Sequence, residues 1–247
     1  MEVLRRTGLG QGSAELKQVS GDYVTEADHA SEDAIVEVLL RRAPGIPILA
    51  EERGGAPAGT RWAVDPLDGT TNFFRALPVV GVSVALLEGG QPVVGVVIGP
   101  WLNLEFAVQR GLGATLNGEP MPPLGRGNPT TAVVATGFPF RRKDRVARYM
   151  PVLRGALSRF EDLRRAGAAS LDLGWTACGT FDGFFELGLG TWDVAAGAAL
   201  VLELGGRVSD WSGGDGWLET GDILAAPAAV HEVLLELAAD SPRESAH

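Results

Sequence analysis

The chain of 247 residues contains one cysteine, Cys178, and three histidines. A single cysteine excludes an intramolecular disulfide framework and any zinc or iron–sulfur site built from several thiolates. Three histidines leave little room for a histidine-rich metal site. No stretch approaches the roughly 20 apolar residues that a membrane-spanning helix needs, and no apolar run of signal-peptide length follows Met1–Arg6. We therefore expect a cytoplasmic protein without a membrane partner.

Lysine is scarce, and basic residues as a whole are outnumbered. The sequence has 21 Lys+Arg against 31 Asp+Glu, for a formal net charge of −10. A nucleic-acid-binding protein should present a basic face, so this balance argues against a nucleic-acid partner. An acidic protein can still bind a phosphorylated molecule when bound divalent cations reverse the local charge.

The pattern of apolar residues predicts alternating strands and helices. Apolar residues make up 45% of the chain and charged residues 21%, which is typical of a globular protein. Helices are predicted at about 26–42, 145–160, 168–177, 194–204 and 228–239. Strands are predicted at about 48–50, 62–64, 79–87, 92–98, 104–109, 114–116, 132–136, 162–165, 183–186, 207–210 and 223–226. The mixture indicates α/β or α+β layers.

Three segments carry further structural expectations. Gly8, Gly10 and Gly12 argue against a helix in the first sixteen residues. The segment 120–129 is rich in proline and glycine and is the candidate boundary between subdomains. In the first predicted helix, apolar residues recur at helical spacing and should face the core; they are Ala27, Ala30, Ala34, Ile35, Val38 and Leu39.

Residues 65–73, with the sequence DPLDGTTNF, are the most informative stretch of the chain. Asp65 and Asp68 stand three residues apart where a strand is expected to end. Pro66 fixes its own φ and Gly69 permits a tight backbone path, so both carboxylates can face one point. The N–H groups and hydroxyls that follow suit an anion, and oxygen-rich sites are what Mg²⁺ prefers. Taken alone, a stretch of this kind is usually an acidic surface turn that caps a strand.

Other acidic residues also follow apolar runs. Glu51 and Glu52 close the preceding predicted strand, and Asp193 lies at a predicted helix N-terminus. Taken alone, two glutamates in a loop are usually solvated, and an aspartate in that position is a good helix cap. If Glu51, Asp193 and the two aspartates of the 65–73 stretch met without cations, they would repel one another strongly. A cluster of that kind implies bound metal.

Five motifs resemble those of the inositol monophosphatase family, and they occur along the chain in the same order as in the family. Residues 65–73 resemble its first signature. The other four motifs are the loop that includes Lys17 and residues 21–28 (GDYVTEAD), the glutamate motif 49–52 (LAEE), the second signature 192–197 (WDVAAG) with 203–206 (ELGG), and the C-terminal strand 221–226 (GDILAA). The resemblance extends from about Lys17 to Ala239.

The resemblance implies an alternating α-β-α-β-α sandwich, the α/β (α+β layered) architecture of inositol monophosphatases and fructose-1,6-bisphosphatases. It implies one catalytic domain over residues 1–247, with an N-terminal α+β lobe at about 17–125 and a C-terminal α/β lobe at about 126–240. The family's N-terminal helix is expected to be shortened or missing here, or else the start of the chain is assigned too late. The resemblance also implies a homodimer, because members of this family commonly form homodimers.

The resemblance also implies a Mg²⁺-dependent, lithium-sensitive phosphatase with two metal ions and a third, weaker one. When the roles of the family's motif residues are transferred to this sequence, Glu51, Asp65 and the carbonyl of Leu67 would hold the first ion. Thr70 with Glu51 would orient the attacking water. The second ion would be held by Asp65, Asp68 and Asp193. The third would lie near Glu51, beside the loop that carries Lys17 and Asp22.

Substrate contacts are implied in the same way. The amides of Gly69 and Thr70 would hold the phosphate. The alcohol half of the substrate would meet Asp68, Gly167, Ala168, Ala169 and Glu186. Arg141–Lys143 and Arg164–Arg165 are interpreted as solvated charges rather than an anion-binding patch.

The leading hypothesis is hydrolysis of myo-inositol 1-phosphate. Same-fold alternatives are phosphatases for histidinol phosphate, fructose 1,6-bisphosphate or 3′-phosphoadenosine 5′-phosphate. The residues Thr71, Asn72 and Phe73 favour the inositol branch, by analogy with the family. A catalytically idle regulatory protein is a further alternative, and the retained acids argue against it.

Overall fold

A computed structural model describes residues 2–10, 14–16, 23–55 and 58–241. Its helices are α1 (Glu2–Thr7), α2 (Glu26–Arg42), α3 (Thr70–Phe74), α4 (Val146–Arg159), α5 (Ala169–Ala177), α6 (Thr191–Glu203), α7 (Trp217–Thr220) and α8 (Ala228–Ala239), with 3₁₀ turns η1 (Pro129–Thr131) and η2 (Lys143–Arg145). Its strands are β1 (Ala14–Leu16), β2 (Tyr23–Thr25), β3 (Ile48–Ala50), β4 (Gly54–Gly55), β5 (Arg61–Asp68), β6 (Gly81–Glu88), β7 (Gln91–Gly99), β8 (Leu104–Gln109), β9 (Gly113–Leu116), β10 (Glu119–Pro120), β11 (Val133–Thr136), β12 (Asp162–Arg164), β13 (Gly183–Glu186), β14 (Arg207–Ser209) and β15 (Ile223–Ala226).

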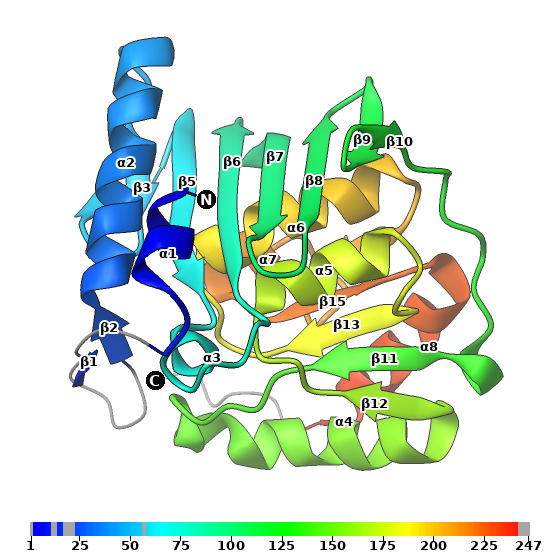
Figure 1. Ribbon diagram of the computed structural model, residues 1–247. Helices are drawn as coiled ribbons and strands as arrows, with labels where there is room; N and C mark the ends of the chain where they lie inside the picture. Colours follow the sequence, from blue (N-terminus) through cyan, green and yellow to red (C-terminus); the bar gives the residue numbers. More distant parts are fainter. Residues whose placement is uncertain (1, 11–13, 17–22, 56–57, 242–247) are drawn as a thin grey trace.

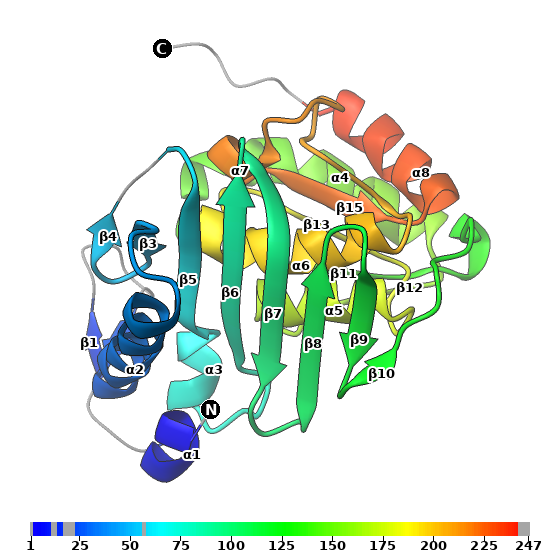
Figure 2. The same ribbon diagram turned by 90° about the horizontal axis from the view of Figure 1, so that it is seen from above.

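Five layers alternate between helices and sheets (Figures 1 and 2). Helices α1 and α2 lie on one side of an eight-stranded sheet, and α5 and α6 lie between that sheet and a five-stranded sheet. Helices α4 and α8 cover the far face of the five-stranded sheet. This α-β-α-β-α order confirms the predicted fold class. None of the described helices is long and apolar enough to cross a membrane.

The eight-stranded sheet has the order β10-β9-β8-β7-β6-β5-β3-β4. Strand β3 runs parallel to β5, and the other neighbours are antiparallel. The predicted hairpin is β6–β7, whose turn uses Gly89 and Gly90 at positive φ. Strand β5 continues through Asp68, whereas the sequence predicted an end near residue 64. The pairing of β5 with β6 shifts register between Asp65 and Asp68, so the strand is irregular there.

The five-stranded sheet has the order β12-β11-β13-β15-β14. Strand β11 pairs parallel with β12 and β13, and β15 pairs antiparallel with β13 and β14. Helices α5 and α6 pack on the inner faces of both sheets, since one continuous apolar core contains residues such as Val97, Phe106, Leu173, Leu200 and Phe184. The division into lobes at about residues 125–126 stays a prediction.

Two local predictions need correction. The glycines were expected to prevent an N-terminal helix, yet α1 forms before them and buries Leu4 completely. Gly8, at φ +79°, follows the last residue of α1.

In α2, Ala30 and Val38 are exposed although their spacing predicted a core face. Ser31 is buried instead, because the face of α2 that meets the protein is partly polar.

Candidate active site

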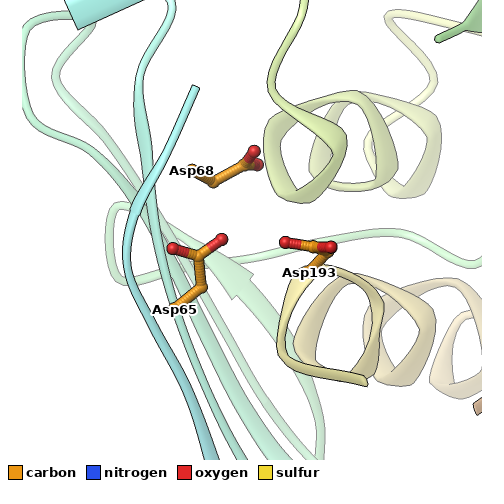
Figure 3. A group of neighbouring side chains, drawn as sticks. All are labelled: Asp65, Asp68 and Asp193. Carbon is orange, nitrogen blue, oxygen red and sulfur yellow. The ribbon is translucent and has the colours of Figure 1, made fainter. Parts of the chain in front are cut away.

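Three carboxylates converge where β5 ends and α6 begins. Asp65 and Asp68 come from β5, and Asp193 is the third residue of α6 (Figure 3). One oxygen of each carboxylate lies within 4.8 Å of the others. Asp193 thus joins two aspartates that lie 125 and 128 positions earlier in the chain. The sequence predicted that these three acids would meet, together with Glu51.

Local hydrogen bonds hold each of these carboxylates in place. The Leu67 N–H donates to Asp65 Oδ1 at 2.9 Å, across the proline that separates the two residues. The Gly190 N–H donates to Asp193 Oδ2 at 2.6 Å, so Asp193 also caps its own helix. Asp68 Oδ2 accepts from both the N–H and the hydroxyl of Ser170, at 2.7 and 2.6 Å. The last pair ties the end of β5 to the start of α5.

Burial and mutual repulsion make the ionised cluster unfavourable without a cation. Burial, followed by the charges of Glu51 and Asp68, raises the pKa of Asp193 to about 7. Burial raises the pKa of Asp68 to about 6 against the opposing hydrogen bonds from Ser170. The pKa of Asp65 is raised well above its usual value by burial and by the neighbouring acids. Clustered carboxylate oxygens that pair with no basic group in the described part of the chain fit a hard divalent cation such as Mg²⁺.

Glu51 lies in the turn after β3 and lines the same cavity as the three aspartates. Its N–H donates to the carbonyl of Val64 at 3.1 Å, which fixes the turn against β5. Glu51 is not a member of the 4.8 Å group of carboxylates found among the described residues. Its charge nevertheless contributes to the raised pKa values of Asp65 and Asp193.

The turn from Gly69 to Thr70 begins the short helix α3. Gly69 has φ +89°, and a Cβ there would lie 3.0 Å from the carbonyl oxygen of Val79 and 3.1 Å from that of Gly167. Glycine is therefore needed both for the backbone conformation and for the close approach of two segments. The Thr70 hydroxyl lies 3.2 Å from the carbonyl oxygen of Leu67, and both residues line the cavity.

The opposite wall carries the residues predicted to meet the alcohol. Gly167, at φ +91°, and Ala169 line the cavity, whereas Ala168 is buried as the N-cap of α5. The Asn72 side-chain amide donates to the carbonyl of Ala166 at 3.0 Å and so anchors this turn. At the end of β13, burial and then the charges of Asp193 and Asp68 raise the pKa of Glu186 to about 8. Lys17 and Asp22 lie outside the described residues.

Helix α2 supplies three contacts that sequence reasoning missed. Asp28 Oδ1 accepts from the Thr70 hydroxyl at 3.2 Å, and the Ser31 hydroxyl donates to the carbonyl of Pro66 at 2.9 Å. Glu32 Oε2 accepts from the N–H of Glu52 at 3.0 Å. All three side chains are buried. Their spacing of three and four residues places them on one helix face, which was the signal available in the sequence.

Basic residues also line the cavity. The lining includes Arg75, Arg141, Arg142, Lys143 and Arg165, all on the exposed surface. Arg164 does not line it in the described part of the chain. The volume of the cavity is about 840 Å³, within the range of small-molecule sites.

Comparison with known proteins agrees with this arrangement. Residues 2–243 match the Inositol monophosphatase family. An inositol-1-monophosphatase from Mesorhizobium japonicum is 39% identical over 96% of this chain and 91% of its own length. A Nus factor SuhB from Pseudomonas aeruginosa is 43% identical over 87% of this chain and 82% of its own. The crystal structure of extragenic suppressor protein suhB from Bartonella henselae superposes with a TM-score of 0.90 at 34% identity, and covers 97% of this chain and 93% of that one.

Proposed function

The chain belongs to the inositol monophosphatase family, and from that membership we propose that it hydrolyses small phosphate monoesters with Mg²⁺, with myo-inositol 1-phosphate as the substrate. The observation that carries the proposal is the group of Asp65, Asp68 and Asp193 oxygens within 4.8 Å beside the Gly69–Thr70 turn. The relative named inositol-1-monophosphatase supports the choice of substrate.

The acidic residues would hold the cations. Glu51, Asp65 and the carbonyl of Leu67 would bind one Mg²⁺, and Asp68 and Asp193 would share a second with Asp65. A third ion beside the Lys17–Asp22 loop belongs to the same proposal. Bound Mg²⁺ would supply Lewis-acid polarisation of the phosphoryl group and a lowered pKa for the attacking water. Carboxylate and carbonyl oxygens are the ligands that Mg²⁺ prefers.

The chain's own groups orient the reactants. The Thr70 hydroxyl donates a hydrogen bond to Asp28 Oδ1 or to the carbonyl of Leu67, each at 3.2 Å, and its oxygen can then accept a hydrogen bond from the attacking water. Glu51 lines the cavity and would accept the other proton of that water. The amides of Gly69 and Thr70 would donate to the phosphate oxygens.

The alcohol half of the substrate would meet the opposite wall. Glu186 would accept from its hydroxyls, and the backbone of Gly167 and Ala169 would supply further polar contacts. Asp68, held by Ser170, joins this wall to the metal ligands. The side chain of Ala168 is buried, so this residue would act only as the N-cap that positions α5.

The relatives named Nus factor SuhB support a second candidate role, as a Nus factor. Such a role does not require loss of the acidic cluster, so the two functions are compatible. A homodimer, lithium sensitivity and a cytoplasmic location belong to the same set of proposals. The first two derive from the family resemblance, and the location derives from the composition of the sequence.

Phosphate release from the purified protein, with and without Mg²⁺, tests the proposal. The substrates to compare are myo-inositol 1-phosphate, histidinol phosphate, fructose 1,6-bisphosphate and 3′-phosphoadenosine 5′-phosphate. We expect Mg²⁺-dependent turnover with myo-inositol 1-phosphate preferred. A clear preference for another ester would contradict the substrate. Folded protein with no turnover on any of the four would contradict the phosphatase and favour the Nus factor role.

A further inference from the structure

The turn between β13 and α6 carries an acidic residue of the cavity at each end. Glu186 is the last residue of β13, and Asp193 is the third residue of α6. Both residues line the cavity. Like charges at the two ends of a short turn repel each other, so the positions of the two side chains depend on what holds the turn.

The start of β15 holds this turn. Strand β15 is the neighbour of β13 in the five-stranded sheet (Figure 1), and the two residues before it, Gly221 and Asp222, meet the turn. The Leu189 N–H donates to the carbonyl of Gly221 at 3.0 Å, and the Gly188 N–H donates to Asp222 Oδ1 at 3.0 Å. A Cβ on Gly221, which has φ +68°, would overlap the carbonyl oxygen of Leu189. Gly221 and Asp222 open the 221–226 motif of the sequence, and these contacts give that motif a structural task at the cavity.

Two guanidinium groups fix Asp222 from the side of α4. Arg145, the N-cap of α4, pairs with Asp222 Oδ1, and Arg148 pairs with Oδ2. All three side chains are at most 16% exposed. The guanidinium carbon of Arg148 also lies 5.5 Å from the ring centroid of Trp211, whose Nε1 donates to the carbonyl of Glu186 at 3.1 Å. Charge-assisted pairs of this kind restrict the direction in which the carboxylate presents its oxygens.

The two acids of the turn tolerate little displacement. A Cβ built on Gly137 would overlap the carboxylate of Glu186, so this carboxylate lies directly against the Gly137 backbone. At the other end of the turn, the Gly190 N–H donates to Asp193 Oδ2 at 2.6 Å. A shift of the turn would therefore change the direction of the Glu186 carboxylate and the place of the Gly190 N–H at the same time.

We propose that Asp222 is a positioning residue, which holds the turn 187–190 so that Glu186 meets the hydroxyls of the substrate and Asp193 meets the cation. This inference rests on the proposed function, which assigns those two roles. Asp222 is not among the described residues that line the cavity, so it acts through the backbone of the turn. Removal of such a supporting contact typically weakens metal binding or activity by about 10- to 100-fold.

Two esters that differ in their alcohol half test the link to Glu186. The alcohol half of myo-inositol 1-phosphate has several free hydroxyls, whereas that of phenyl phosphate has none. In Asp222→Ala at saturating Mg²⁺, we expect kcat/KM to fall about 10-fold more for the inositol ester than for phenyl phosphate, mainly through KM. In a Glu186→Gln background, Asp222→Ala should affect the two esters equally, because the carboxylate that it positions is gone.

Calorimetric titration with Mg²⁺ tests the link to Asp193 without any substrate. Asp222→Ala should weaken Mg²⁺ binding by about 10-fold. The matched control is Asp182→Ala, which also removes a carboxylate that accepts a backbone N–H. Asp182 accepts the N–H of Val133 at 2.9 Å before the other end of β13, and it is not among the described residues that line the cavity. This control should keep the native ester ratio and the native Mg²⁺ affinity.

Several results would overturn the inference. An equal loss on both esters in Asp222→Ala, or an unchanged Mg²⁺ affinity, would do so. The same changes in Asp182→Ala would also do so, since they would then follow from lost stability alone. If Asp222→Ala does not fold, Asp222→Asn replaces it under the same criteria, because it keeps one oxygen for the Gly188 N–H.

Failure of the proposed function is a separate outcome. If the native protein does not hydrolyse the inositol ester, that function fails, and the Mg²⁺ titrations of native protein, Asp222→Ala and Asp182→Ala then decide this inference. A native protein that binds no Mg²⁺ would overturn both.

Discussion

The hydroxyl of Thr70 lies 3.2 Å from a carboxylate oxygen of Asp28, 42 positions earlier in the chain. The other oxygen of Asp28 accepts from the N–H and the hydroxyl of Thr25, at 2.8 and 2.5 Å. Asp28 therefore caps α2 and orients Thr70 at the same time. Its burial raises its pKa to about 6, with smaller contributions from Glu52 and Glu51.

Replacing Asp28 by asparagine should lower activity without unfolding the protein. Asparagine cannot reproduce all the hydrogen bonds that a carboxylate accepts from Thr25 and Thr70 together. We expect kcat for the preferred monoester to fall about 100-fold or more with a small change in KM. Thr70→Ser, which keeps the hydroxyl, is the control and should retain most activity. Near-native kcat in Asp28→Asn would show that the pair does not orient the water.

Replacing Asp65 by asparagine should have opposite effects on activity and on stability without metal. Because Asp65 would bridge both ions, turnover should fall below detection. In EDTA the same substitution removes the free-energy cost of burying a carboxyl group, whose pKa is raised, among other acids, so the free energy of unfolding should rise by about 1–3 kcal/mol. Urea denaturation and phosphate release measure the two effects. More than a small fraction of native turnover would contradict the two-metal assignment.

Stability in EDTA should fall as the pH rises from about 4.5 to 8. Glu186 has a folded-state pKa of about 8 against a usual value of 4.5, and Asp193 has about 7 against 3.8. Between these limits the folded state binds more protons than the unfolded state, so the free energy of unfolding decreases with pH. Urea titrations at intervals of one pH unit measure the slope.

Two controls identify the groups behind this slope. Glu186→Gln should make the decline shallower, since it removes one of the carboxyl groups whose pKa is raised. Saturating Mg²⁺ should remove much of the remainder, because cations would stabilise the ionised aspartates of the folded state. A stability in EDTA that stays constant or increases over this pH range would contradict the raised pKa values.

Replacing Glu32 by alanine should weaken metal binding through the Glu51 turn. Glu32 Oε2 accepts the N–H of Glu52, and its Oε1 lies 2.8 Å from Arg53 Nε. We expect the Mg²⁺ concentration for half-maximal activity to rise about 10-fold and the free energy of unfolding to fall by about 1–3 kcal/mol. Glu37→Ala, on the exposed part of the same helix, should change neither. An unchanged Mg²⁺ requirement in Glu32→Ala would show that Glu32 stabilises the fold but does not support metal binding.

The layered fold and the convergence of the acids could be predicted from sequence. Asp65, Asp68 and Asp193 each occupy positions where a strand or helix end is evident from local pattern, and the structure brings them together. The strand around Asp65 was predicted too short, because a proline usually ends a strand. The register shift in β5 accommodates Pro66 and lets pairing resume at Asp68.

Contacts that depend on how a helix is rotated could not be predicted. In α2 the apolar spacing placed Ala30 in the core, whereas Ser31, which donates a hydrogen bond, and Glu32, which accepts one, are buried and turn a polar face inward. A hydrophobic pattern scores such residues as solvent-facing, although they are satisfied by partners far along the chain. Arg165 is exposed, in keeping with its interpretation as a solvated charge, but its contacts with the rings of Phe138 and Phe140 involve another segment and could not be predicted.

The central helix layer has a consequence for synthesis on the ribosome. Strands β5 to β8 are complete at Gln109, but α5 and α6, which cover their apolar face, end only at Glu203. At about 5–20 residues synthesised per second, roughly 5–20 s pass between the completion of β8 and the completion of α6. During that interval the face is available to chaperones and to other nascent chains. A product truncated before α6 is therefore an aggregation hazard rather than a stable half.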